Sequence, residues 1–524
     1  MAKESQQLEL IKSKSSSDES SSEQLKKRES EELVIAFSGA VGSGLKKSVE
    51  IAKQVLISEG YNVKEIRVSN LIINIAKKMS GTGIDVTVDE RNKKDRYFKL
   101  QNAGNILRNL HGNEILSELV ISEITVLRKA EQIEKTGNDT ASTDDYTPPK
   151  TAYLINQLKH PAEVELLKTV YGDLFYLIGV LASENIRKKA LIDEDLSDSE
   201  AAEVMERDRK EDMSYGQQLE KTLLLADFFI RDNHSNDKIL LGKVERFIQL
   251  MHGYNGLTPT YDEYGMYSAY SASLKSACLS RQVGASITNT QGNVIATGCN
   301  DVPKSKGGLY TEVNDPDNRC VNKGECFNDK YKDKLCVEIS NVLSDELKMD
   351  ASQANKIAYL IKDNSRLKDL IEFSRSVHAE MDAITSVARE GGVSVKNCTL
   401  YTTTFPCHNC ARHIIASGIT NVIYIEPYEK SLALQLHGDD ISYDPTESES
   451  ESRKVVFMHF EGVSPKQYMN FFCSRGDRKD SKGKVIKNTI HPRLKVAREY
   501  LDSYRDFEKK IISNLNELGI INNE

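Results

Sequence analysis

Two cysteines stand with two residues between them in the run TTFPCHNC at 403–410. Such a pair can form a redox couple, half of a structural zinc site, or two ligands of a catalytic metal. Catalytic zinc usually takes three protein ligands and one water molecule, so a third ligand must come from elsewhere in the chain. The run SVHAEMDAI supplies His378, and Glu380 follows two residues later. We therefore predict that His378, Cys407 and Cys410 hold zinc and that Glu380 lies beside the metal without binding it.

The residue types of this predicted site suit hydrolysis. Zinc lowers the pKa of a bound water molecule from ~15.7 toward 7. A neighbouring carboxylate can take the proton of that water and pass it to a ring nitrogen and then to a leaving amine. His378 and Cys407 would both lie at helix starts, where backbone amides favour thiolates. His-x-Glu followed by Pro-Cys-x-x-Cys resembles the signature of zinc-dependent cytosine and adenine deaminases.

Four runs of the C-terminal half resemble deoxycytidylate deaminases in order and content. The resemblance covers roughly residues 262–430, and it implies that Asn300 helps to bind a nucleotide and that Arg281 lies near its phosphate. The four runs are SRQVGASI at 280–287, GCNDVP at 298–303, HAEMDAI at 378–384 and TLYTTTFPCHNCARHIIASGI at 399–419.

Three further cysteines, Cys320, Cys326 and Cys336, are spaced loosely within the run DNRCVNKGECFNDKYKDKLC. Two interpretations stay open: ligands of a second zinc ion, or free thiols within an insertion. No fourth ligand for a second zinc can be identified from the sequence.

A glycine-rich stretch, FSGAVGSGLKKS at 37–48, follows an expected strand and precedes an expected helix. In this setting backbone N–H groups can surround an anion. Leu45 stands where the phosphate-binding motif has lysine. We predict nucleotide or phosphate binding without efficient γ-phosphate transfer, and a structural turn is the alternative. The residues of this predicted site are Gly39, Gly42, Gly44, Lys46, Lys47 and Ser48.

Alternating strand and helix patterns place these motifs in two α/β domains. The stretches NQLKHPAEVELLKTVYG and LLADFFIRDN resemble nucleoside monophosphate kinases. We expect an N-terminal P-loop kinase-like three-layer domain and a C-terminal cytidine deaminase-like α/β/α domain. The predicted boundaries are 1–32 for a mobile leader, 33–240 for the kinase-like domain, 241–261 for a linker and 262–524 for the deaminase domain, with an insertion at 304–370.

Composition narrows the classes of function. The 524 residues carry a net charge of −8, which gives no global basic field for nucleic acid and favours small-molecule substrates. No apolar run approaches the ~20 residues of a membrane-spanning helix, and the first residues lack the apolar core of a signal peptide. Nine cysteines, an odd number in a long chain, argue against a disulfide framework. We expect a cytoplasmic protein without membrane contact.

The order of the two domains resembles that of the bacterial anti-phage dCTP deaminases. This resemblance implies conversion of dCTP and dCMP to the uridine nucleotides, depletion of dCTP during infection, and restraint before infection, in some systems by a small RNA. Deoxycytidylate deaminase-like domains commonly form homo-oligomers, so we expect one here.

Three alternatives remain for the function. The first is a housekeeping dCMP deaminase with an appended nucleotide-sensing domain, and the second is a nucleotide sensor with a relict site. The third is a polynucleotide-editing deaminase. Editing needs a groove with basic and aromatic residues, whereas this chain is acidic and contains no tryptophan.

Overall fold

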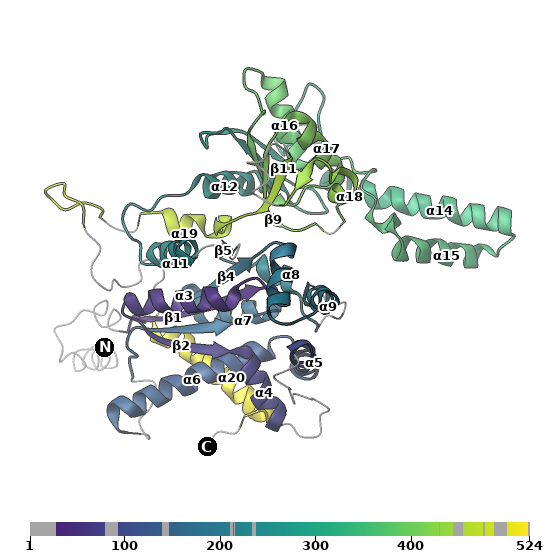
Figure 1. The fold of residues 1–524 in the computed structure, drawn as a ribbon. Coiled ribbons are helices and arrows are strands. Elements are labelled where there is room, and N and C mark those ends of the chain that lie inside the picture. Colours follow the sequence, from purple (N-terminus) through teal and green to yellow (C-terminus); the bar gives the residue numbers. More distant parts are fainter. Residues whose placement is uncertain are drawn as a thin grey trace, which may run out of the picture. The chain divides into compact units, whose positions relative to one another are not determined.

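The computed structural model describes residues 28–78, 93–138, 146–209, 213, 215–232, 237–428, 430–443, 454–474, 477–486 and 500–521 (Figure 1). The chain divides into two compact units. The first holds residues 1–226, 234–256 and 473–524, and the second holds 227–233 and 257–472. Each contains a sheet rich in parallel strands with helices against it, so the predicted α/β class is confirmed. The predicted leader lies outside the described residues as far as residue 27.

The sheet of the first unit is parallel, and its strands follow the order β4-β1-β3-β2. All eight residues of β1 are buried, as expected for a central strand with helices on both faces. The strands are β1 (Glu32–Gly39), β2 (Asn62–Arg67), β3 (Thr151–Asn156) and β4 (Phe175–Leu181).

Helices cover both faces of this sheet. The β1-to-β2 and β3-to-β4 connections run in opposite directions along the sheet, so right-handed crossovers place their helices α3 and α7 on opposite faces. Helix α11 packs on α3, whereas α6 and α20 pack with α7. The helices of this unit are α3 (Leu45–Ser58), α4 (Val68–Lys78), α5 (Lys93–His111), α6 (Ile115–Thr136), α7 (Pro161–Tyr171), α8 (Glu184–Asp193), α9 (Asp198–Arg209), α10 (Leu219–Leu223), α11 (Asp237–Met251) and α20 (Leu501–Glu517).

The second unit has a mixed sheet in the order β10-β11-β9-β8-β6-β7. Strand β6 runs antiparallel to both neighbours, and the other pairs are parallel. The strands are β6 (Gly284–Thr288), β7 (Val294–Cys299), β8 (Thr399–Thr404), β9 (Asn421–Glu426), β10 (Ile441–Ser442) and β11 (Val455–His459). A further antiparallel pair is formed by β5 (Phe228–Arg231) and β12 (Gly462–Val463).

Helices also cover both faces of the second sheet. Gly284 of β6 lies directly against α12, whereas the next residue, Ala285, belongs to the core that α16 and α17 share with the strands. Neighbouring residues of a strand point to opposite faces, so α12 lies on one face and α16 and α17 on the other. The helices are α12 (Tyr261–Ser273), α16 (Ala379–Glu390), α17 (His408–Ser417), α18 (Ala433–His437) and α19 (Tyr468–Phe472).

An insertion separates β7 from α16. Its ends meet where the Val377 amide donates to the Asp301 carbonyl at 2.9 Å, close to the predicted limits 304 and 370. It contains α13 (Cys320–Lys323), α14 (Phe327–Leu347) and α15 (Ala351–Asn364). Helices α14 and α15 form a hairpin that extends away from the sheet of their own unit (Figure 1).

The predicted boundaries differ from the structure in three places. Strand β5, expected within the kinase-like domain, belongs to the second unit. Helix α11 occupies much of the predicted linker 241–261. Helix α20, expected within the deaminase domain, belongs to the first unit instead. It is held there by buried Arg128 of α6, which pairs with Glu508 of α20 at 2.7 Å and with Glu32 of β1 at 3.0 Å. None of the helices within the described ranges is long and apolar enough to cross a membrane.

Candidate active site

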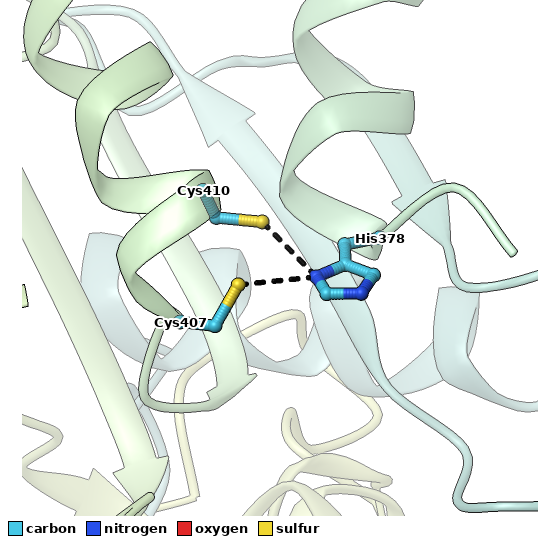
Figure 2. A group of neighbouring side chains, drawn as sticks. All are labelled: His378, Cys407 and Cys410. Atoms are coloured by element: carbon cyan, nitrogen blue, oxygen red, sulfur yellow. Dashed lines mark hydrogen bonds between the residues drawn. The ribbon is translucent and has the colours of Figure 1, made fainter. Parts of the chain in front are cut away.

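The three predicted zinc ligands lie together at the starts of two helices. His378 caps the N-terminus of α16, Cys407 caps that of α17, and Cys410 lies in the first turn of α17. Figure 2 shows Nδ1 of His378 facing both sulfur atoms, at 3.3 Å from Cys407 and 3.4 Å from Cys410. Within the described ranges, this is the one group of three or more His, Cys, Asp or Glu residues whose ligand atoms lie within 4.8 Å of one another.

The spacing of these atoms fits a zinc ion. Zinc–sulfur bonds of about 2.3 Å and zinc–nitrogen bonds of about 2.0 Å at a tetrahedral angle separate sulfur and nitrogen by about 3.5 Å. One imidazole and two thiol groups are also a donor set that zinc prefers. His378, Cys407 and Cys410 would therefore supply three positions of a tetrahedral site, with Nδ1 as the histidine ligand.

The cluster is electrostatically prepared for a cation. A hydrogen bond from Cys410, together with the neighbouring His378, lowers the pKa of the Cys407 thiol to about 4. The Cys407 sulfur in turn raises the pKa of His378 to about 9, despite its burial. The pKa of Cys410 is raised, because the hydrogen bond to Cys407 keeps the proton on Cys410. One thiolate thus exists before any metal arrives, and metal binding releases the remaining protons.

Glu380 lies beside the cluster. Its side chain is 4% exposed, and its Oε2 accepts a hydrogen bond from the Cys410 sulfur at 3.4 Å. Burial, followed by the Cys407 sulfur, raises the pKa of the carboxyl group. A carboxyl group with a raised pKa is better suited to accept a proton and donate it again during a reaction.

A cavity of about 320 Å³ opens onto this cluster. Its lining includes His378, Glu380 and Cys407, together with Asn300 and Arg281. The structure therefore places all the residues predicted for metal binding, proton transfer and substrate binding at one cavity except Cys410, which lies directly behind it. This volume is within the range of small-molecule sites, about 300–1,000 Å³.

The two predicted substrate-binding residues have structural partners. The Asn300 side chain accepts a hydrogen bond from the Val283 amide and donates one to the Arg281 carbonyl, both at 2.8 Å. It thereby shapes the turn before β6. The Arg281 guanidinium pairs with Glu426 at 3.1 Å, with Tyr428 beneath it. Half of the Arg281 side chain remains exposed, at 47%.

The three cysteines proposed for a second zinc ion do not come together. Cys320 and Cys326 line the cavity, whereas Cys336 is fully buried in α14. They form no cluster of metal ligands in the part of the chain that the structure describes. Cys320 begins α13, Cys326 lies at the start of α14, and Cys336 lies further along α14.

The glycine-rich loop of the first unit connects β1 to α3. Gly42 and Gly44 have φ angles of 80° and 81°, which favour glycine. Val41 lies just before Gly42 in the loop. Its amide donates a hydrogen bond to the buried carboxylate of Asp208 on α9 at 2.7 Å. Lys159, which follows β3, forms an ion pair with the same carboxylate. The Asp208 side chain thus accepts a hydrogen bond from a loop amide that would bind a phosphate oxygen in a phosphate-binding loop.

The other predicted loop residues have varied surroundings. Gly39 ends β1, and a side chain there would collide with the Val180 carbonyl. Lys46 is exposed, Lys47 pairs with Asp237, and the Ser48 hydroxyl donates to the Gly44 carbonyl at 3.3 Å.

Comparison with known proteins assigns the second unit. Residues 259–426 match the model of the cytidine and deoxycytidylate deaminase zinc-binding region. The chain is 30% identical over 174 residues to the deoxycytidylate deaminase of Enterobacteria phage T2, a match covering 31% of this chain and 78% of the relative. It belongs to the cytidine and deoxycytidylate deaminase family. The phage T4 deoxycytidylate deaminase is also 30% identical, over 175 residues that cover 31% of this chain and 76% of the relative.

Family membership confirms the predicted deaminase-like region and its zinc cofactor. A solved dCMP deaminase from cyanophage S-TIM5 is 18% identical, covers 38% of this chain and 99% of its own, and has a TM-score of 0.21, which is too low to add support. The matched region of the deaminase family ends at Glu426, so the kinase-like character of the first unit stays a prediction.

The sequence did not single out several residues of the deaminase cavity. Arg375 lies three residues before His378, and Lys368 lies in the insertion, yet both line the cavity. Tyr428 also lines it, two residues after β9. The position of Arg375 close to His378 in the sequence could have indicated that it lines the cavity, whereas no local pattern indicates this for Lys368.

Proposed function

We propose that this chain catalyses zinc-dependent hydrolytic deamination of deoxycytidine nucleotides, converting dCMP and dCTP to dUMP and dUTP. The observation that carries the proposal is a buried carboxylate, Glu380, beside a His-Cys-Cys cluster at one cavity. Two of the deaminase relatives, from phages T2 and T4, are named for deoxycytidylate as the substrate.

Each residue has a defined task in this reaction. When bound, zinc supplies Lewis-acid activation of a water molecule at neutral pH. Glu380 accepts one proton from that water and passes it to the pyrimidine ring nitrogen, and it then takes the second proton from the same oxygen and passes it to the exocyclic amino group. Ammonia leaves, and the water oxygen remains as the new carbonyl of uracil. Asn300 and Arg281 lie at the same cavity and position the nucleotide.

Substitution of Glu380 tests the reaction. Glu380→Gln should lower kcat for dCMP and dCTP by about a hundredfold to ten-thousandfold, the usual contribution of a general acid–base group. Zinc content and thermal stability should persist, because glutamine has the same shape. Glu390→Gln, at the exposed end of the same helix, is the matched control. Full activity of the Glu380→Gln enzyme would rule out the proposed role.

Substrate choice separates this proposal from polynucleotide editing. The wild-type protein should deaminate free nucleotides but not a cytosine-containing oligonucleotide. The reverse preference would favour an editing enzyme. Loss of activity on every cytosine substrate, with zinc bound, would favour a nucleotide sensor with a relict site.

We further propose depletion of dCTP during phage infection as the physiological role. The support is the resemblance of the two-domain order to anti-phage dCTP deaminases. Restraint before infection, in some systems by a small RNA, belongs to the same resemblance. The proposed homo-oligomer rests on the resemblance to deoxycytidylate deaminases, and the proposed cytoplasmic location rests on the composition. The dCTP pool should fall on infection in cells with the wild-type protein and stay constant in cells with the Glu380→Gln variant. Equal pools in both would favour a housekeeping dCMP deaminase.

The glycine-rich loop supports a second proposal, that the first unit binds a nucleotide or phosphate group. The loop lies between a buried strand and a helix, and its residues include two glycines with positive φ. Leu45 is buried in place of a lysine, so binding without efficient phosphoryl transfer follows.

A further inference from the structure

Part of the wall of the deaminase cavity comes from the insertion. Besides the metal cluster, the cavity is lined by Phe327, Asn328 and Asp329 at the start of α14, and by Lys332 and Lys368 of the same insertion. Since α14 is 21 residues long and begins here, the positive end of its dipole faces the cavity. The insertion therefore lines the same cavity as Glu380.

Five basic side chains line this cavity, and three of them already have partners. Arg281 pairs with Glu426 at 3.1 Å, and Lys430 pairs with Asp369 at 2.8 Å. The ammonium group of Lys332 donates to the Lys368 carbonyl at 3.0 Å and lies 3.4 Å from Asp329. These three side chains are therefore committed to protein oxygens. The remaining two are Arg375 and Lys368.

Arg375 and Lys368 have no carboxylate partner among the described residues. The Arg375 guanidinium instead lies over the ring of Phe327, 4.8 Å from its centroid. Stacking of this kind fixes the plane of the guanidinium and leaves its N–H edge available for phosphate oxygens. The Lys368 side chain is exposed. The backbone carbonyl of Lys368 accepts the hydrogen bond from Lys332.

We propose that Arg375 and Lys368 bind the terminal phosphates of a deoxycytidine triphosphate, so that the insertion makes this deaminase accept dCTP as well as dCMP. The inference rests on the proposed deaminase function. A triphosphate carries more negative charge than a monophosphate and extends further from the base. The positive helix end and two unpaired cations of the insertion match that additional charge.

Substrate discrimination tests this assignment. Arg375→Gln and Lys368→Gln should each lower the ratio of kcat/KM for dCTP to that for dCMP by about tenfold or more, the worth of one charge-assisted hydrogen bond. Arg366→Gln is the matched control, since Arg366 is an exposed residue of the same insertion that does not line the cavity. Its ratio should equal that of the wild-type enzyme.

Binding provides a readout that is independent of turnover. In the Glu380→Gln background, Arg375→Gln should weaken dCTP binding more than dCMP binding in calorimetry. An equal loss for both nucleotides, or no loss, would overturn the inference. If Arg375→Gln loses zinc or unfolds, Lys368→Gln at the surface decides by the same ratio. A wild-type protein that deaminates neither nucleotide refutes the proposed function itself, whereas an active enzyme with an unchanged ratio refutes only the phosphate assignment.

Discussion

The chemistry of the site depends on a few atoms held at two helix starts. His378 and Cys407 both have extended backbone conformations at the cap position, and their side chains turn toward each other as their helices begin. Glu380 and Cys410 then follow within the first turns, where burial excludes water. Because every ligand lies at or just inside a helix start, the geometry of the site follows from the packing of α16 and α17.

Removal of one thiol should remove the metal. Cys410→Ser replaces a soft ligand that zinc prefers with a hydroxyl group, so metal analysis should show zinc falling from one per chain toward none. The melting temperature of the second unit should fall as well, because bound metal stabilises the folded state by mass action. Cys473→Ser is the control, since Cys473 is an exposed free thiol outside the cluster. A Cys410→Ser protein with unchanged zinc content would contradict this ligand assignment.

At the scale of secondary-structure elements, the glycine-rich loop is closed by its own chain. Val41 packs in an apolar cluster with Leu191 of α8 and with Val204 and Met205 of α9, and α9 delivers Asp208 to the loop amide. The loop therefore holds an internal anion that a phosphate must replace. Lys159, which pairs with this carboxylate, would then face the incoming ligand.

Neutralising Asp208 should strengthen anion binding at the loop. Asp208→Asn keeps an oxygen for the Val41 amide but removes the competing charge and leaves Lys159 unpaired. We expect ATP, used as the probe, to bind about tenfold more tightly in calorimetry, which corresponds to about 1.4 kcal/mol. The melting temperature of the variant should also rise in phosphate buffer relative to chloride.

The matched control for this loop experiment is Asp193→Asn, at the exposed end of α8. It should bind ATP like the wild-type protein. If Asp208→Asn binds ATP no better than wild type while remaining folded, the loop is a structural turn rather than a nucleotide site.

At the scale of the whole molecule, the order of the chain is not the order of its units. The last helix, α20, belongs to the first unit, where Glu508 and Glu32 share the buried Arg128. Tyrosine hydroxyls complete the cluster, with Tyr153 donating to Glu32 at 2.9 Å and Tyr171 to Glu508 at 2.8 Å. Burial alone would raise the pKa of Glu32, but Arg128 and the hydrogen bonds from Tyr504 and Tyr153 together outweigh this effect and lower the pKa.

Loss of Arg128 should release α20. Arg128→Leu leaves two buried carboxylates without their ion-pair partner, so we expect the free energy of unfolding to fall by about 3–5 kcal/mol. Hydrogen exchange at 500–521 should accelerate selectively. Lys129→Leu, on the exposed neighbouring position of the same helix, should leave exchange unchanged. Continued protection of α20 in Arg128→Leu would show that apolar packing, rather than the ion cluster, holds this helix.

The sequence by itself predicted the chemistry of the deaminase site, because the residues that carry it stand close together in the chain. His378 and Glu380 are two residues apart, Cys407 and Cys410 are three apart, and each pair begins a helix whose pattern is local. The α/β alternation was readable for the same reason. A strand or helix of a few residues carries its own periodicity.

Only the tertiary structure decided which distant segments meet. It brings the start of α14 and Arg375 to the cavity of Glu380, sets Asp208 on the glycine-rich loop, and joins Glu508 to Arg128 across 380 residues. Such contacts depend on packing and burial rather than on local spacing. The residues next to a single arginine or aspartate in the sequence do not indicate which distant residue it will contact. The predicted deaminase site could therefore be recognised from the sequence, whereas the proposed phosphate-binding residues and the contact of Asp208 with the loop required the fold.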